Sequence, residues 1–319
     1  MQRILIALAI VILVALFWRG VEYSPQEYTL GGGPEGGTFL LYTKGLVKML
    51  QQRLPDAHFE VTSSGGSVTN LIDLEKGRVD LTLAYAGDID LGRRGQLENH
   101  PKPLKKIVAV ARVYGSTAQL VVLADSVIKT PENLVNRRVA IGSSGSGAAH
   151  SAERYFRILG IWDEIIPIYM GYDMAMKELA NRSIQAVWQM VGAPSASIAD
   201  TGTRYPLRLI DLGELADQSD FLLKYPFYTK ATIPAGTYVW QTSPVGSFQD
   251  NTLLVARPDT DPQLIDTVLN LLFSPEGMKQ MREVHPIGKE LDPKKALQGV
   301  QIPLHPAAAD FWRERGMVK

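Results

Sequence analysis

The chain has 319 residues, contains no cysteine, and balances 33 Lys and Arg residues against 33 Asp and Glu residues. The missing cysteines exclude disulfides, thiolate metal sites and cysteine nucleophiles. The balanced charge argues against a nucleic-acid-binding surface, which should be basic. The length suffices for two lobes with separate cores.

The first 21 residues differ from everything that follows. Arg3 precedes an apolar run from Ile4 to Trp18, and Arg19-Gly20 ends it. A basic start and an apolar run are typical of an export signal, although no A-x-A cleavage pattern precedes Gly20. The run is short for a transmembrane helix, which needs about 17–25 apolar residues. We interpret residues 1–21 as a signal peptide or an uncleaved membrane anchor, and both place the protein outside the cytoplasmic membrane.

The next part of the chain predicts alternating strands and helices. The pattern gives strands at residues 28–30, 59–62 and 79–85, and helices at residues 39–53 and 68–76. Gly31–Thr38 and Ser63–Ser67 are the turns that open the two helices. A strand–helix–strand rhythm of this kind indicates a parallel sheet with helices on its faces.

A second series of the same kind follows two strands at residues 107–113 and 119–124. It contains strands at 138–142, 166–169 and 184–190, and helices at 148–159 and 173–180. A strand at 252–256 and helices at 262–273, 275–282 and 307–315 complete the chain. We predict an α/β protein with two lobes, each a mixed sheet flanked by helices: residues 28–120 plus 240–319 form lobe 1, and residues 121–239 form lobe 2.

Three small-residue turns each follow a strand and open a helix: Gly31–Thr38, Ser63–Ser67 and Ser143–Gly147. In open α/β sheets, ligands bind beyond the carboxyl ends of the strands. The free N–H groups of a helix start favour an anion there by about 0.3–1 kcal/mol, or ~2 when partly buried. Helix capping alone also accounts for Ser67 and Ser146, but three such turns in one chain favour a binding site for a small carboxylate.

The chemistry-bearing residues point to binding rather than catalysis. Gly31–Gly36 matches the dinucleotide pattern G-x-G-x-x-G, but Pro34 removes one phosphate-facing N–H, and no acidic residue closes a strand about 20 residues later. The chain has neither a P-loop nor a nucleophile elbow, and its five histidines are not spaced as metal ligands. Asp88 and Asp90 are interpreted as caps of a turn. We predict no enzyme activity, no metal and no cofactor; a dinucleotide-dependent enzyme is the weaker alternative.

Aromatic and amide side chains near strand ends complete the candidate cleft. Tyr85, Trp188, Tyr238 and Trp240 suit the walls of a ligand pocket, although core packing is the ordinary role of each. Gln189 and Gln241 are placed to hydrogen-bond a ligand amide or carboxylate.

The ordered motifs resemble the TAXI family of solute receptors, which serve tripartite ATP-independent periplasmic (TRAP) transporters. The resemblance covers nearly the whole chain after the N-terminal segment, and it rests on motifs in this order: Gly36-Gly37-Thr38, Gly65-Gly66-Ser67-Val68 with Asn70-Leu71, Gly77 with Val79-Asp80-Leu81, Arg138–Gly142 with Gly145-Ser146-Gly147, Ile233–Tyr238, and Ile302–Pro306.

The resemblance implies a two-lobed type II periplasmic-binding-protein fold that closes on glutamate or another small carboxylate. It also implies delivery to the membrane permease subunits of a TRAP transporter; a membrane-anchored ligand sensor that partners a signalling protein is the alternative. The expected ligand contacts are Thr38, Ser67, Asn70, Tyr85, Ser143, Ser146, Gly147, Gln189, Tyr238 and Gln241. The stretch Tyr85-Ala86-Gly87-Asp88 departs from the Gln-Ser-Asp that family members often carry, which leaves the identity of the ligand open.

Overall fold

The computed structural model describes residues 25–98 and 100–318. The N-terminal segment predicted as a signal or anchor, residues 1–21, lies outside these ranges. Within them, no helix has both the length and the apolar character needed to cross a bilayer.

One sheet of ten strands organises the described part of the chain, in the order β2-β1-β3-β10-β4-β7-β5-β6, with β8 paired to β4 and β9 to β10. β1, β2 and β3 pair in parallel at one end, and β5, β6 and β7 pair in parallel at the other. The two long antiparallel strands β4 and β10 join these ends. The strands are β1 (Glu27–Gly31), β2 (His58–Thr62), β3 (Leu81–Tyr85), β4 (Val108–Leu123), β5 (Arg138–Gly142), β6 (Ile166–Tyr169), β7 (Ala186–Val191), β8 (Leu207–Ile210), β9 (Thr229–Ile233) and β10 (Val245–Ala256).

β4 corrects one prediction. The sequence predicted two strands, at residues 107–113 and 119–124, but the structure has a single buried strand of 16 residues. The intervening segment stays extended because β10 pairs with it through Asn251 opposite Gly115 and Gln249 opposite Thr117. β10 is correspondingly longer than the predicted strand at 252–256.

The helices begin close to their predicted positions because the capping signals are local. Ser146 accepts a hydrogen bond from the Ala149 N–H at the start of α5, and Ser274 does the same for Gly277 at the start of α11. The α-helices are α2 (Thr38–Arg53), α3 (Ser67–Glu75), α4 (Ala86–Arg93), α5 (Gly147–Ile158), α6 (Tyr172–Ala180), α7 (Ala196–Gly202), α8 (Gly213–Gln218), α9 (Phe221–Lys224), α10 (Pro262–Leu272), α11 (Pro275–Val284) and α12 (Pro306–Glu314), and short 3₁₀ turns cover Pro131–Leu134, Trp162–Glu164, Pro286–Glu290 and Pro293–Lys295.

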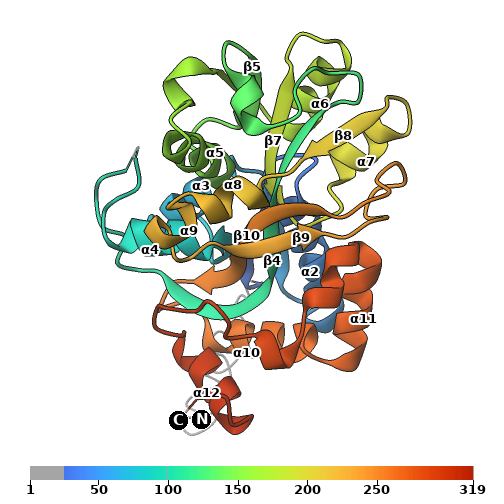
Figure 1. Ribbon diagram of the computed structural model, residues 1–319. Coiled ribbons are helices and arrows are strands. Elements are labelled where there is room, and N and C mark those ends of the chain that lie inside the picture. Colours follow the sequence, from blue (N-terminus) through green and yellow to red (C-terminus); the bar gives the residue numbers. More distant parts are fainter. Residues whose placement is uncertain (1–24, 99, 319) are drawn as a thin grey trace, which may run out of the picture.

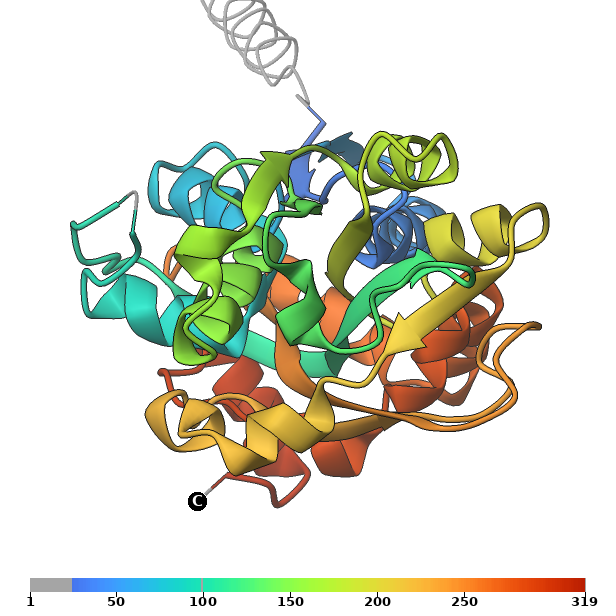
Figure 2. The same ribbon diagram turned by 45° about the horizontal axis from the view of Figure 1, so that its top comes forward.

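The middle of the chain lies at one end of the molecule, and its first and last parts share the other. Figure 1 shows β5, α5, α6 and β7 at the top and α2, α10, α11 and α12 at the bottom. α5 lies beside α3 in both Figure 1 and Figure 2, where the two ends of the molecule meet. A single cluster of buried apolar side chains continues through this junction, from Leu30 and Val110 to Trp188. The two ends are therefore packed together in this structure.

Candidate functional site

A narrow cleft lies where the two parallel strand series end, at the junction of the two ends of the molecule. Its free volume is about 20 Å³, which is room for roughly one water molecule. Strand-to-helix turns from both series form its walls, and the lining residues are Pro34, Gly37, Thr38, Phe39, Gly65, Gly66, Ser67, Tyr85, Ser146, Gly147, Ala148, Tyr172 and Val191. The structure thus brings together five of the predicted contacts: Thr38, Ser67, Tyr85, Ser146 and Gly147.

Four helices, α2, α3, α5 and α6, start at this cleft, α6 with its first residue, Tyr172. The first turns of α2, α3 and α5 carry no acidic residue, α6 has Asp173 in its first turn, and none of the residues that line the cleft is charged. The unpaired N–H groups and the dipoles at the starts of α2, α3 and α5 favour an anion in the cleft without a cation. Gly66, in front of α3, has φ +116, a conformation that favours glycine and lets the chain turn sharply into the helix.

The walls of the cleft are tied together across the junction. The Tyr85 hydroxyl donates to the carbonyl oxygen of Met190, and Thr38 Oγ1 donates to the carbonyl oxygen of Gly192 at 3.3 Å. The Tyr85 ring also packs edge-on against Phe39, with ring centroids 5.1 Å apart. Burial raises the pKa of the Tyr85 hydroxyl well above its ordinary value, so this group remains a donor. The two hydrogen bonds cross the junction, whereas the Phe39 contact positions the Tyr85 ring within its own wall.

Serine side chains in the cleft serve the local fold in the closed state. Ser67 Oγ accepts from the Tyr85 N–H at 2.9 Å, and Ser146 Oγ accepts from the Ala149 N–H at 3.0 Å. Ser143, a further predicted contact, lies one turn before α5 and is partly exposed; its carbonyl accepts from the Ser146 N–H at 3.1 Å. Each hydroxyl can still donate to a ligand, because a serine oxygen has one O–H besides its acceptor sites.

Four other predicted contacts are outside this cleft, with polar groups bonded inside the protein. Asn70 Nδ2 donates to the carbonyls of Gly32 and Leu83, which fixes the turns around it. Gln189 is fully buried and exchanges hydrogen bonds with Ser195 and Ser197 at the start of α7.

Tyr238 and Gln241 shape the turn that follows β9. The Tyr238 hydroxyl donates to Gln119 and accepts from the Ser195 N–H at 2.8 Å, and its ring stacks on Trp240. Gln241 donates to the carbonyls of Ile233 and Ser243. Tyr238 thus has a partner 119 residues away, whereas both partners of Gln241 are local.

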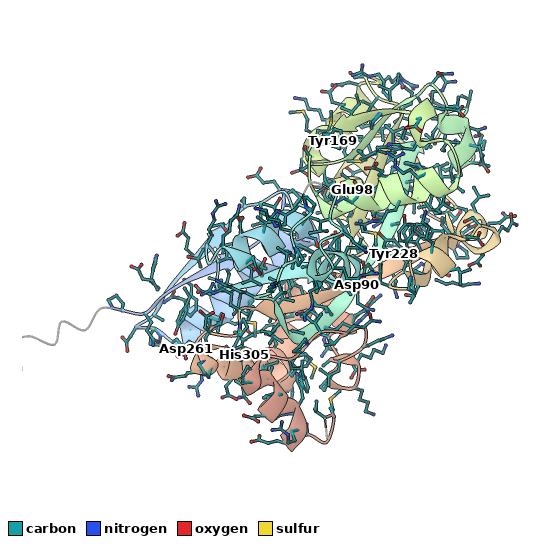
Figure 3. All side chains as sticks on the ribbon, turned by 90° about the vertical axis from the view of Figure 1, so that its left-hand side faces the viewer. Asp90, Glu98, Tyr169, Tyr228, Asp261 and His305 are labelled. Atoms are coloured by element: carbon teal, nitrogen blue, oxygen red, sulfur yellow. The ribbon has the colours of Figure 1, made fainter. Side chains whose placement is uncertain are left out.

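A buried charged cluster lies behind the cleft wall. Arg154 of α5 donates to Asp88 Oδ1 of α4 at 3.2 Å and to the Tyr228 hydroxyl at 3.0 Å. Both oxygens of Asp250, on β10, accept from the Gly87 N–H, at 3.3 and 3.1 Å. All four side chains are at most 5% exposed. Figure 3 marks Tyr228 near the level where the two ends of the molecule meet. The sequence interpretation of Asp88 as a turn cap missed this cluster, because Arg154 is 66 residues away.

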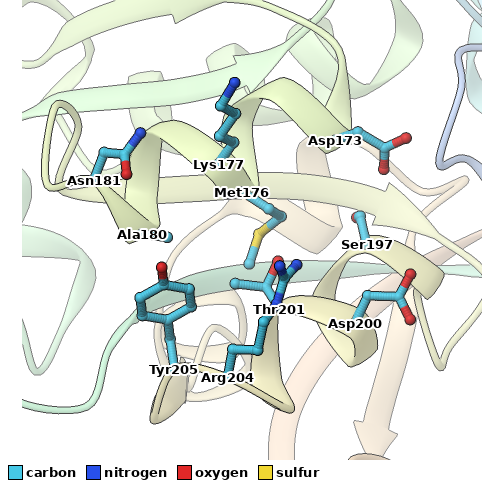
Figure 4. Close-up of a pocket in the computed structure, with 10 residues that line it drawn as sticks. All are labelled: Asp173, Met176, Lys177, Ala180, Asn181, Ser197, Asp200, Thr201, Arg204 and Tyr205. Carbon is cyan, nitrogen blue, oxygen red and sulfur yellow. The ribbon is translucent and has the colours of Figure 1, made fainter.

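A second and wider cavity lies between α6 and α7 (Figure 4). It has a volume of about 450 Å³ and is open to solvent. Two cations, Lys177 and Arg204, and two carboxylates, Asp173 and Asp200, line it together with Tyr205. We call it the α6–α7 groove. All its lining residues come from residues 173–205, so it does not lie between the two strand series.

Among the described residues, no group of three or more His, Cys, Asp or Glu side chains is arranged to hold a metal ion. The three buried or partly buried histidines with a lowered pKa are His150, His285 and His305, and burial is the main cause in each case. His285 and His305 use their rings to cap the turns that follow them.

Comparison with known proteins places the chain among solute-binding folds. It is similar to the periplasmic binding protein BugD, with 14% identity and a TM-score of 0.55 over 93% of this chain and 100% of that one. It is also similar to a putative L-cystine ABC transporter protein from Listeria monocytogenes, with 17% identity and a TM-score of 0.51 over 83% and 96% of the two chains. A third structure, Tv2483 bound to L-arginine, has 15% identity and a TM-score of 0.50 over 83% and 92%.

At these identities the structural likeness shows the fold alone, which is the predicted periplasmic-binding-protein type. The family is shown by the sequence, since residues 30–316 match the model of the NMT1-like family. This chain therefore belongs to the NMT1-like family and has a mixed α/β fold of the periplasmic-binding-protein type.

Proposed function

We propose that this protein is a non-enzymatic, extracytoplasmic solute receptor that captures a small carboxylate or amino acid by closing two lobes on it. The lobes are residues 28–120 plus 240–319 and residues 121–239. The observation that carries the proposal is the uncharged cleft at the ends of both strand series, where α2, α3 and α5 start. Three converging helix starts favour a carboxylate, and a cleft between two lobes suits capture by hinge closure.

The described structure corresponds to the closed state of such a receptor. The cleft has a free volume of about 20 Å³, which leaves no room for an amino acid. The two lobes must therefore move apart at the junction before a ligand can enter. The two hydrogen bonds from Tyr85 and Thr38 to β7 and the residue after it are the contacts that opening must break. Thr38, Ser67, Tyr85, Ser146 and Gly147 then face the ligand, with Ser143 at the edge.

The partner is a finer proposal. We infer that the receptor delivers its ligand to the permease subunits of a TRAP-type transporter, in line with the TAXI-like motifs of the sequence. Residues 1–21 would carry the chain out of the cytoplasm or tether it to the outer face of the inner membrane. Fractionation of cells that express the full chain tests the location: the proposal requires recovery from the periplasm or the inner membrane.

The binding step is tested with the full chain in mild detergent, screened by thermal unfolding against amino acids and small carboxylates. A ligand at 100 times its Kd should raise the free energy of unfolding by about 2.7 kcal/mol. Ser146→Ala and Ser274→Ala make a matched pair, because each serine caps a helix and each loss costs about 1 kcal/mol. Only Ser146→Ala should weaken ligand binding, by roughly tenfold. If no compound stabilises the protein, the proposed receptor function is wrong; if a ligand binds but both variants bind it equally, the proposed cleft is wrong.

A further inference from the structure

Asp88 has one carboxylate oxygen that nothing in the described protein uses. The residue lies in the first turn of α4 and is 1% exposed. Its Oδ1 accepts from Arg154 at 3.2 Å, but Oδ2 has no hydrogen-bond partner among the described residues. A buried charged oxygen without a partner is costly, so such an atom requires an explanation.

Asp88 Oδ2 lies directly behind the wall of the cleft. A methyl group built on Gly147 would lie 2.1 Å from Asp88 Oδ2, 2.7 Å from the Tyr85 ring and 2.9 Å from Ser67 Cβ. Gly147, Tyr85 and Ser67 all line the cleft. The unpaired oxygen therefore lies directly beside the bare Cα of Gly147, which is itself a wall of the cleft.

The groups around Asp88 balance its charge but do not satisfy its second oxygen. Two carboxylates, Asp88 and Asp250, share one guanidinium, Arg154, and all three are at least 95% buried. Arg154 directs its second arm to the Tyr228 hydroxyl, and Asp250 is bonded to the Gly87 N–H. Burial, followed by the nearby Asp88 charge, raises the pKa of Asp250 well above its ordinary value. With its pKa raised, Asp250 holds its proton, so Arg154 balances the charge of Asp88. What the cluster lacks is a hydrogen-bond donor for Asp88 Oδ2, and none of its bonded partners reaches that oxygen.

We propose that Asp88 Oδ2 binds the ammonium group of the ligand, while the starts of α2, α3 and α5 receive its carboxylate. The ligand class is then a small zwitterion, an amino acid rather than a simple carboxylic acid. The inference rests on the proposed solute-binding function and deepens it. The ammonium enters between Gly147 and Asp88 and donates to the oxygen that is unpaired in the closed state.

Calorimetry on the wild-type full chain tests this with matched pairs that differ only in the amino group: glycine and acetate, L-alanine and propanoate, L-glutamate and glutarate. We expect at least one amino acid to bind tenfold or more tightly than its partner acid. A partner acid that binds as tightly as its amino acid would overturn the ammonium site and leave the receptor function standing. If neither member of any pair binds, nor any other compound in a broad solute screen, the receptor function itself fails.

Asp88→Asn then identifies the residue. The variant should bring the affinity of the amino acid down to that of its partner acid and leave the affinity of the acid within about twofold. Asp200→Asn, the same change in the α6–α7 groove, serves as the control and should keep the full preference. A preference that survives in Asp88→Asn overturns the assignment. Because the wild-type pairs need no variant, the ammonium site remains falsifiable even if Asp88→Asn does not fold.

Discussion

The closed cleft and the α6–α7 groove differ in charge, burial and origin. The cleft is lined by uncharged residues from both strand series and holds about 20 Å³, whereas the groove is lined by four charged side chains from residues 173–205 and holds about 450 Å³. Charged side chains keep a groove open because water solvates each of them. Helix starts and small residues let two walls approach until hardly any space remains.

For the proposed receptor, the difference means that volume alone would select the groove and pass over the cleft. A receptor without ligand can satisfy the walls of its cleft with one another, as Tyr85 and Thr38 do through the carbonyls of Met190 and Gly192. What then identifies the site is convergence: helix starts from distant parts of the chain, hydrogen bonds across the junction, and an unpaired buried oxygen behind the wall. The groove shows none of these features in the described residues. Matched substitutions, one in the cleft and one in the groove, test whether the two cavities differ in this way.

The largest expected effect is on stability, from Tyr85→Ala in the cleft against Tyr205→Ala in the groove. Tyr85 is 6% exposed and bonded across the junction, so its loss should cost about 3–5 kcal/mol of unfolding free energy. Tyr205 is 39% exposed and should cost less than about 0.5 kcal/mol. Urea unfolding measures both. Equal costs would mean that the contacts of Tyr85 across the junction do not hold the cleft closed.

The sequence predicted the elements well where their signals are local. The start of α5 follows from Ser146, which precedes the helix and whose side chain accepts a hydrogen bond from the Ala149 N–H. The continuity of β4 could not be predicted, because β10, which keeps residues 114–118 extended, is more than a hundred residues away. Within the site, the glycine and serine turns were found by their pattern, but Asp88 was not, since its partner Arg154 is distant in sequence. Gln189 and Tyr238, which the family resemblance assigned to the ligand, are bonded inside the protein in this structure, and their role toward a ligand stays a prediction.

A smaller effect is expected from glycine substitutions at the two cavities. Gly147→Ala places a methyl group against Asp88, Tyr85 and Ser67, all within 3 Å, whereas an alanine at Gly171, in front of α6, meets nothing within 4 Å. We expect Gly147→Ala to destabilise the closed protein by about 1–3 kcal/mol, the usual cost of overpacking. It should also enlarge the molecule in small-angle scattering, because the walls are pushed apart. Gly171→Ala should change neither quantity, and a Gly147→Ala protein as compact and stable as the wild type would show that the walls are not tightly closed.

The smallest effect is a pH dependence that separates the two cavities. Burial raises the pKa of Asp250 behind the cleft, and burial followed by Glu35 and Asp200 raises that of Asp173 in the groove. A raised pKa means that the folded state holds the proton more tightly than the unfolded chain. The resulting stabilisation is complete below the ordinary Asp pKa of about 4 and is lost as the pH rises through the folded value. Asp250→Asn, which cannot titrate, should therefore gain stability relative to the wild type as the pH rises.

Asp173→Asn should show the same sign with a weaker slope, because solvent screens a partly exposed carboxylate. Urea unfolding between about pH 4 and pH 8 measures both slopes. A steeper slope for Asp173→Asn would mean that the groove carboxylate is the more strongly desolvated of the two, and the comparison of the two cavities would then be reversed.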